Sequence, residues 1–153
     1  MKPEVSSVAI RDVTFGTEVR VVEPVNLYEC EIGDGSFIGP FVEIQKGVVV
    51  GKRCKIQSHA FICEMVTIGD DCFISHGVTF INDNFSTGGP ANGQRQFWKS
   101  TTIAARVSIG SNATILPVSI VSDVVIGAGS VVTKDILAPG TYAGNPARKI
   151  TKS

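Results

Sequence analysis

The chain has 153 residues, with 14 Lys and Arg balanced by 14 Asp and Glu, so its formal net charge is zero. Because nucleic acids are bound through an excess of positive charge, this balance argues against DNA or RNA as the main partner. Apolar residues make up 43% and aromatic residues 7%, no run approaches the roughly 18 apolar residues of a membrane span, and no signal-like stretch follows Met1. We therefore expect one cytoplasmic domain over residues 1–153 that binds neither nucleic acid nor membrane.

A six-residue period runs along most of the chain. It starts irregularly over residues 7–31, takes a step of five after Leu27, and is strict from Ile32 to Phe80. The large apolar positions are Ile32, Ile38, Ile44, Val50, Ile56, Ile62, Ile68, Ile74 and Phe80. Four residues after each of the first eight comes a small or β-branched residue, namely Ser36, Val42, Val48, Cys54, Ala60, Val66, Cys72 and Val78. A period of six matches neither a helix nor a plain strand, so it predicts short strands separated by corners, as in a β-solenoid.

Glycines and cysteines fit this pattern. Gly33, Gly39, Gly51 and Gly69 directly follow large residues, where we expect a bend that has no room for a Cβ atom. The four cysteines, Cys30, Cys54, Cys63 and Cys72, contain no Cys-x-x-Cys pair, so the sequence predicts neither a metal site nor a dithiol site. Cys54 and Cys72 lie 18 residues apart in the small column, which predicts that they stack inside the solenoid as free thiols.

The period stops after Phe80. The segment 81–102 is rich in Asn, Gly, Ser and Pro, and it interrupts a repeat that resumes in phase at Ile103. An interruption of this length in a tight solenoid predicts either a disordered insertion or a functional loop. After Ile115 a second step of five leads to Ile120, and the repeat then ends at Val132.

The tail 133–153 should close the open end of the solenoid. Gly140, Gly144 and Pro146 exclude a further coil, and an exposed end of parallel strands needs a cover because unpaired edges invite aggregation. The sequence predicts a short C-terminal cap.

The repeat, together with the segments 42–45, 54–62, 80–83 and 97–103, resembles the hexapeptide-repeat acyltransferases, and within that family the bacterial sugar N-acetyltransferases. The resemblance implies an all-β fold, a left-handed parallel β-helix with three hexads per 18-residue coil. It also implies acetyl transfer from acetyl-CoA, without a metal, to the amine of a dTDP- or UDP-linked 3- or 4-amino sugar. Family members are homotrimers whose sites are built from two subunits.

The two histidines are candidates for proton transfer. Repeat phase directs His59 and His76 outward on adjacent coils, near one edge of the solenoid. An imidazole with its ordinary pKa of about 6.5 can accept the proton that an ammonium must lose before it attacks a thioester. We prefer His76 as the base and assign His59 to substrate binding, while decoration of the surface is the alternative for both.

Asn82 is the second catalytic candidate, because an Asn at the head of the loop lies near the acetyl group in related sugar acetyltransferases. Some relatives have no side-chain base, so Asn82 could orient the thioester while the substrate disposes of its proton. Glu64, one coil earlier at the same phase, and Asp83 are assigned to substrate binding. The alternative is that Asn82 and Asp83 only start a turn.

Further candidates follow from the resemblance. Arg95, Trp98 and Lys99 on the loop could bind the nucleotide diphosphate and base. Ala104, Ala105, Gly127 and Ala128 could lie against the pantetheine arm of coenzyme A, with Arg148 and Lys149 at its phosphates. Small corner residues and a solvated basic tail are the alternative.

Three other functions compete with amine acetylation. O-acetylation of a sugar or serine needs the same fold, and so does a non-catalytic β-helix that serves in assembly. A γ-type carbonic anhydrase requires three histidines around zinc, and the chain has only two.

Overall fold

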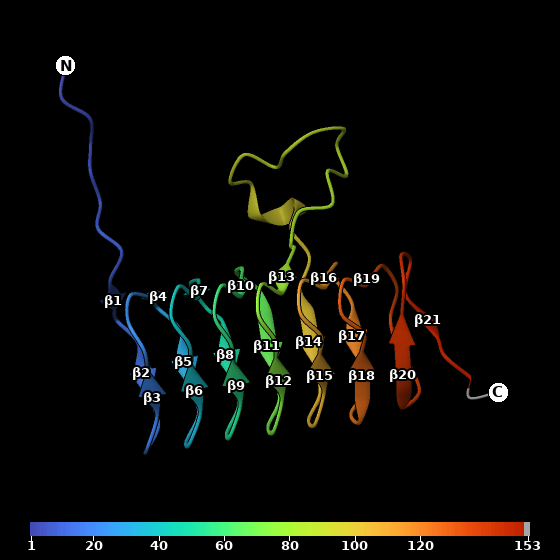
Figure 1. Cartoon of the computed structure of the whole chain (residues 1–153). Coiled ribbons are helices and arrows are strands. Elements are labelled where there is room, and N and C mark those ends of the chain that lie inside the picture. Colours follow the sequence, from blue (N-terminus) through green and yellow to red (C-terminus); the bar gives the residue numbers. More distant parts are fainter. Residues whose placement is uncertain (152–153) are drawn as a thin grey trace.

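A computed structural model describes residues 1–151, in which the chain winds through three sheets of short parallel strands (Figure 1). Sheet A contains β1 (Ile10–Arg11), β4 (Asn26–Tyr28), β7 (Glu43–Ile44), β10 (Phe61–Ile62), β13 (Thr79–Phe80), β16 (Thr114–Ile115) and β19 (Val131–Val132). Sheet B contains β2 (Thr14–Phe15), β5 (Glu31–Ile32), β8 (Val49–Val50), β11 (Val66–Ile68), β14 (Thr101–Ile103) and β17 (Ser119–Ile120). Sheet C contains β3 (Arg20–Val21), β6 (Phe37–Ile38), β9 (Lys55–Ile56), β12 (Phe73–Ile74), β15 (Ser108–Ile109), β18 (Val124–Ile126), β20 (Gly140–Ala143) and β21 (Arg148–Lys149). The predicted left-handed parallel β-helix is confirmed.

The pairing register follows the sequence period. Ile38 pairs with Ile56 and Ile56 pairs with Ile74, each 18 residues along the chain. Where the sequence takes a step of five, the register shortens to 17, as between Leu27 and Ile44. Each coil therefore visits sheets A, B and C in turn, and three corners join them. We call these the A–B, B–C and C–A corners.

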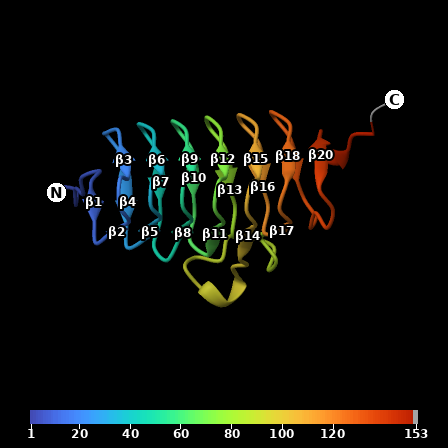
Figure 2. The ribbon, with the colours of Figure 1, turned by 90° about the horizontal axis from the view of Figure 1, so that it is seen from below.

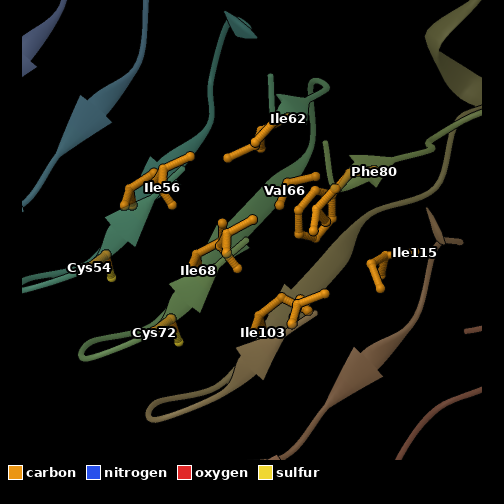
Figure 3. Close-up of a cluster of buried hydrophobic side chains, with 14 of the residues drawn as sticks. Cys54, Ile56, Ile62, Val66, Ile68, Cys72, Phe80, Ile103 and Ile115 are labelled. Atoms are coloured by element: carbon orange, nitrogen blue, oxygen red, sulfur yellow. The ribbon is translucent and has the colours of Figure 1, made fainter. Parts of the chain in front are cut away.

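The interior consists of the two predicted columns. The large residues of the strict repeat are all at most 1% exposed, and the small residues beside them at most 2%. Figure 3 shows Ile56, Ile62, Ile68 and Phe80 directed into this interior. Packing of this kind is the main source of stability, at roughly 25 cal/mol for each Å² of apolar surface removed from water. The first coil is less tightly packed, and its Phe15 remains 39% exposed.

The glycines that follow the large residues are required by contact with the next coil, and not by the bend itself. A Cβ on Gly33 would lie 2.6 Å from the backbone of Gly51, and one on Gly51 would lie 2.7 Å from the backbone of Gly69. The left-handed backbone needed for the corner falls two residues later, at Gly35 and Arg53. Close stacking of successive coils, rather than backbone freedom, therefore selects these glycines.

The small column also carries polar groups that bond within the wall. The Ser36 hydroxyl donates to the Gly51 carbonyl at 2.9 Å, and the thiols of Cys54 and Cys72 contact the carbonyls of Gly69 and Ala104, each at 3.1 Å. Figure 3 shows Cys54 and Cys72 on successive coils, as predicted. All four cysteines are buried free thiols.

The B–C corner carries a ladder of exposed ion pairs. The Arg53 guanidinium holds both oxygens of Asp71, at 2.7 and 2.9 Å, and Arg106 holds Asp123 in the same way. These bonds lower the pKa of Asp71 below its ordinary value. They link coils that already share a backbone ladder, so they add little to the core's stabilisation.

The long interruption leaves the solenoid at the A–B corner, between β13 and β14 (Figure 2). It holds one 3-10 turn, η1 (Arg95–Phe97). Strand β14 begins at Thr101, which is buried and pairs with Val66, so the loop covers 81–100 instead of the expected 81–102. Ile103 pairs with Ile68 as if no insertion intervened.

The C-terminal cap continues the solenoid before it reverses. Ile136 pairs with Ile120 beside sheet B, and β20 then extends sheet C in parallel with β18. The chain next turns back, so that β21 runs antiparallel to β20 and covers the sheet edge. Residues 152–153 of the predicted cap lie outside the described part. Within residues 1–151, no helix has the length and apolar character to cross a membrane.

Candidate functional site

A cavity of about 500 Å³ lies on the outer surface of sheet A, at the A–B corner where the loop departs. It brings together aromatic, amide and acidic side chains from four successive coils and from the loop. Its lining residues are Tyr28, Gln45, Phe61, Cys63, Glu64, Thr79, Phe80, Ile81, Asn82, Asp83, Phe85 and Trp98.

The repeat itself stacks the floor of this cavity. Phe61 and Thr79 precede large buried residues and therefore point outward, and they pair in register on β10 and β13. Tyr28 and Gln45 follow large buried residues on β4 and β7 and continue the same surface. Because successive coils repeat the phase, outward residues of one column form a continuous strip.

The loop is fixed to the corner through Asp83. One carboxylate oxygen accepts the amide of Phe85 at 2.9 Å and the other accepts the amide of Ala91 at 2.7 Å. Asp83 also pairs with Trp98 as an isolated antiparallel bridge, and the Lys99 amide donates to the Asn82 carbonyl at 2.9 Å. The turn-forming role considered from the sequence therefore applies to Asp83, which orders the loop at both ends.

A second set of interactions connects the loop to Glu64 beside the cavity. The Arg95 guanidinium forms an ion pair with Glu64 and lies 5.7 Å from the centre of the Trp98 ring. The Asn82 side-chain amide donates to the Glu64 carbonyl at 3.2 Å. Arg95, Trp98, Asn82 and Glu64, each predicted from the sequence as a site residue, are thus brought together around one cavity.

Polar side chains extend this site across sheet A toward the first coil. Gln45 donates to Glu43 at 2.9 Å and its own side-chain oxygen accepts the Glu64 amide at 3.3 Å. Asn26 donates to the other Glu43 oxygen at 3.1 Å. The pKa of Tyr28 is raised, first by burial and then by the negative charges of Glu43 and Glu64. Tyr28 therefore keeps its hydroxyl proton and can donate a hydrogen bond into the cavity.

The histidines occupy a different edge of the same sheet. His59 and His76 lie exposed on successive coils of the C–A corner, as predicted. The His59 ring stacks on Phe41, with centroids 4.9 Å apart, and Nδ1 of His76 lies 2.9 Å from the Ser58 hydroxyl. His76 precedes β13 and Asn82 follows it, so the strand separates the two catalytic candidates within one chain.

The four small residues proposed for coenzyme A divide between two corners. Ala104 and Ala105 follow β14 at the B–C corner, whereas Gly127 and Ala128 follow β18 at the C–A corner, on the edge that carries His76. A Cβ on Gly127 would lie 2.9 Å from the Cβ of Ala143, which pairs with Arg148. Gly127, Ala128, Arg148 and Lys149 therefore lie together at the C-terminal end, and Ala104 and Ala105 lie apart from them.

Several lining residues were absent from the sequence-based candidates. They are Tyr28, Gln45, Phe61, Cys63, Thr79, Phe80, Ile81 and Phe85. Tyr28, Gln45, Phe61 and Thr79 share outward phase along sheet A, a signal that could have been collected from the repeat alone. Cys63 and Phe80 are buried, and Ile81 and Phe85 belong to the loop. Burial raises the pKa of the Cys63 thiol to about 12, so this group lines the wall as a neutral side chain. Within residues 1–151, no group of three or more His, Cys, Asp or Glu side chains is arranged to hold a metal ion.

Two family models match the repeat. Residues 29–64 match the bacterial transferase hexapeptide model, and residues 101–134 match the hexapeptide repeat of succinyl-transferase. The chain belongs to the hexapeptide-repeat acyltransferase family. Among curated relatives, the bifunctional protein GlmU of a Synechococcus species is 31% identical over 94% of this chain, and that of Sphingopyxis alaskensis is 33% identical over 82%. The chain spans 33% and 31% of their respective lengths.

Solved members of the hexapeptide-repeat family have the same fold. A mutant of AntD, an N-acyltransferase from Bacillus cereus in complex with dTDP and coenzyme A, is similar with a TM-score of 0.77 and 25% identity. The match covers 90% of this chain and 82% of AntD. A hexapeptide-repeat acetyltransferase from Vibrio cholerae, complexed with acetyl-CoA, has a TM-score of 0.67 and 25% identity over 78% of this chain and 69% of its own.

Proposed function

We propose that this protein is an acyltransferase that moves an acetyl group from acetyl-CoA to the amine of a nucleotide-linked amino sugar. The observation that carries this proposal is the cavity at the A–B corner, where aromatic and acidic side chains converge beneath the loop. The likeness to AntD, whose structure contains dTDP and coenzyme A, supports both classes of substrate.

In this proposal the nucleotide sugar binds in the cavity. The flat faces of Trp98 and Phe85 suit stacking with a base or sugar, and Arg95 and Lys99 supply positive charge for a diphosphate. Glu64 lines the cavity and Glu43 lies behind Gln45, so carboxylates adjoin the wall and could attract the amine of an amino sugar once Arg95 turns from Glu64 to the diphosphate. Asn82 lies between the two regions, where its amide can orient the acetyl carbonyl.

Coenzyme A would lie along the C–A corner. Gly127 and Ala128 leave that corner without bulky side chains, and Arg148 and Lys149 place two cations at its C-terminal end. The thioester would then approach His76, which lies at the same corner. This arrangement leaves Ala104 and Ala105 as structural residues of the opposite corner.

An ammonium substrate first loses one proton to solvent, and the neutral amine then passes a second proton from nitrogen to sulfur. The amine nitrogen bonds to the acetyl carbonyl carbon, the carbon–sulfur bond breaks, and the proton that leaves the amine ends on the thiolate of coenzyme A. His76 acts as the base, accepting the proton at Nε2 and returning it to sulfur. The side-chain amide of Asn82 donates a hydrogen bond to the oxyanion of the tetrahedral intermediate.

A homotrimer completes the site. His76 and Asn82 lie six residues apart at opposite ends of β13, a separation of up to roughly 20 Å for an extended chain. A second subunit against sheet A would bring the C–A corner of one chain to the cavity of another and would enclose the exposed histidines. A monomer in sedimentation that retains full activity would contradict the shared site.

The decisive test is coenzyme A release by the purified protein with acetyl-CoA and a panel of dTDP- and UDP-linked sugars. Each amino sugar is paired with the sugar that carries a hydroxyl at the same carbon. Turnover with one or more amino sugars and not with their hydroxyl partners supports the proposal. Turnover with the hydroxyl sugars instead would assign O-acetylation, and turnover with neither would favour an assembly role.

A further inference from the structure

The hydroxyl of Ser58 lies 2.9 Å from Nδ1 of His76, across two successive coils of the C–A corner. The backbone fixes this approach, because the Gly77 amide donates to the Ser58 carbonyl at 3.0 Å and holds the two successive coils in register. The hydrogen bond between Ser58 and His76 joins residues 18 positions apart, which is the length of one regular coil. The solenoid therefore holds the hydroxyl against one defined nitrogen of the ring.

We propose that Ser58 is a positioning residue that holds His76 in the tautomer with hydrogen on Nδ1, leaving Nε2 free as a proton acceptor. This inference rests on the proposed function, in which His76 takes the proton of the substrate amine. It adds a residue from outside the cavity to the reaction, and it specifies which ring nitrogen acts.

The direction of the hydrogen bond follows from the proton cycle. When His76 carries two protons, Nδ1 can only donate, so the Ser58 oxygen must accept. The neutral tautomer with hydrogen on Nδ1 keeps that direction, and Nε2 can then gain and lose a proton without rotation of the hydroxyl. The opposite tautomer already carries hydrogen on Nε2 and cannot accept a proton there.

A hydroxyl also suits a base better than a carboxylate would at this position. A carboxylate beside a histidine favours the charged ring, whereas a hydroxyl carries no charge that would favour it. The adjoining strands and corners contribute Lys55 on β9 and His59 on the preceding coil as their titratable groups. Neither supplies negative charge, so Ser58 is the partner that sets the ring's orientation.

The tautomer can be read directly, because the chain has only two histidines. In two-bond ¹⁵N–¹H spectra of the labelled protein at pH 8, we expect His76 to be protonated on Nδ1. Ser58→Ala should shift it toward the form protonated on Nε2 and leave the signals of His59 unchanged. A wild-type His76 protonated on Nε2, or a tautomer that Ser58→Ala does not change, would overturn the proposal.

Kinetics supply the second readout. Ser58→Ala should lower kcat about tenfold with little change in KM for acetyl-CoA, and Ser58→Thr should recover most of the loss because it keeps a hydroxyl. Ser58→Asp should move the acidic limb of the pH profile to higher pH. The matched control is Ser111→Ala, which has the same repeat position on the coil after His76, two coils after Ser58, and should change none of these.

The NMR and kinetic measurements together distinguish failure of this inference from failure of the proposed function. An unchanged tautomer in Ser58→Ala overturns the positioning role whatever the activity. A shifted tautomer in a protein that transfers no acetyl group would overturn the proposed function and leave the hydrogen-bond geometry standing. Equal kcat in Ser58→Ala and wild type, with acetyl transfer intact, would likewise exclude Ser58 from the reaction.

Discussion

The regular coils and the loop 81–100 are built by different rules. In the coils, every sixth residue is large and buried, and each corner must fit the coil above it. In the loop only Ala91 is buried, and order comes from a few side chains, chiefly Asp83 and the Arg95–Glu64 pair. The difference teaches that the solenoid tolerates an insertion wherever its register resumes, and that the cavity forms where the repeat is interrupted.

The largest expected effect comes from removing the loop. Ile103 pairs with Ile68 over 35 residues, whereas Ile68 pairs with Val50 over 18, so deletion of the 17 residues Asn84–Ser100 restores a regular coil. We expect acetyl transfer to fall below detection, because the deletion removes Phe85, Arg95 and Trp98 from the site. Thermal unfolding by circular dichroism should remain a single transition near the wild-type midpoint.

The control for this deletion is Thr87→Ala within the loop, an exposed residue that does not line the cavity and should retain activity. Wild-type turnover by the deletion variant would show that the loop is a spacer. Loss of the folded state would instead show that loop and solenoid are one cooperative unit, which would contradict the independent folding of the coils.

The second effect concerns the C–A corner. His76→Asn should lower kcat by about 10²–10⁴-fold with a modest change in substrate affinity, and the acidic limb of the pH profile should disappear. His59→Asn, one coil away on the same corner, is the matched control. If His76→Asn has little effect and Asn82→Ala is the more damaging change, the substrate amine loses its proton without a side-chain base.

The third effect measures the solenoid itself. Ile68→Ala removes a fully buried side chain from the middle of the core, and it should lower the free energy of unfolding by about 2–5 kcal/mol. Thr67→Ala on the same strand, with its side chain exposed, should change it little. Urea unfolding followed by circular dichroism makes the comparison, and equal midpoints for the two variants would contradict the assigned interior.

The smallest effect comes from the exposed ladder at the B–C corner. Arg53 lowers the pKa of Asp71, so the pair stabilises the fold above the ordinary pKa of Asp and loses this contribution as pH falls through the lowered value. Arg53→Ala should therefore shift the urea midpoint slightly at pH 7 and not at all at strongly acidic pH. A shift as large as that of Ile68→Ala would mean that the corner, and not the core, secures the coils.

The sequence was sufficient for the solenoid because the repeat constrains it at every sixth residue. The columns, the shortened coils after Leu27 and Ile115 and the outward histidines all follow from phase. The reason for the glycines did not, because the contact between Gly33 and Gly51 exists only once the coils are stacked. The division of Ala104 from Gly127 also needed the corner assignment that the structure provides.

The cavity was harder to predict from sequence. Asn82, Glu64 and Trp98 were found through their position beside the loop, whereas Gln45 and Tyr28 lie two and three coils before it and become neighbours only through stacking. The Asp83 carboxylate could not be assigned between substrate and backbone, because the amides of Phe85 and Ala91 reach it only after the loop folds.

Hydrogen–deuterium exchange with and without dTDP or UDP tests most directly whether the interrupted region binds the nucleotide. We predict that nucleotide slows exchange in the loop 81–100 and in peptides that contain Tyr28, Gln45 and Glu64, while strands of sheet C near Lys55 and Phe73 remain unchanged. Protection that spares the loop and appears on the strands of sheet C would contradict the assignment of the cavity as the substrate site.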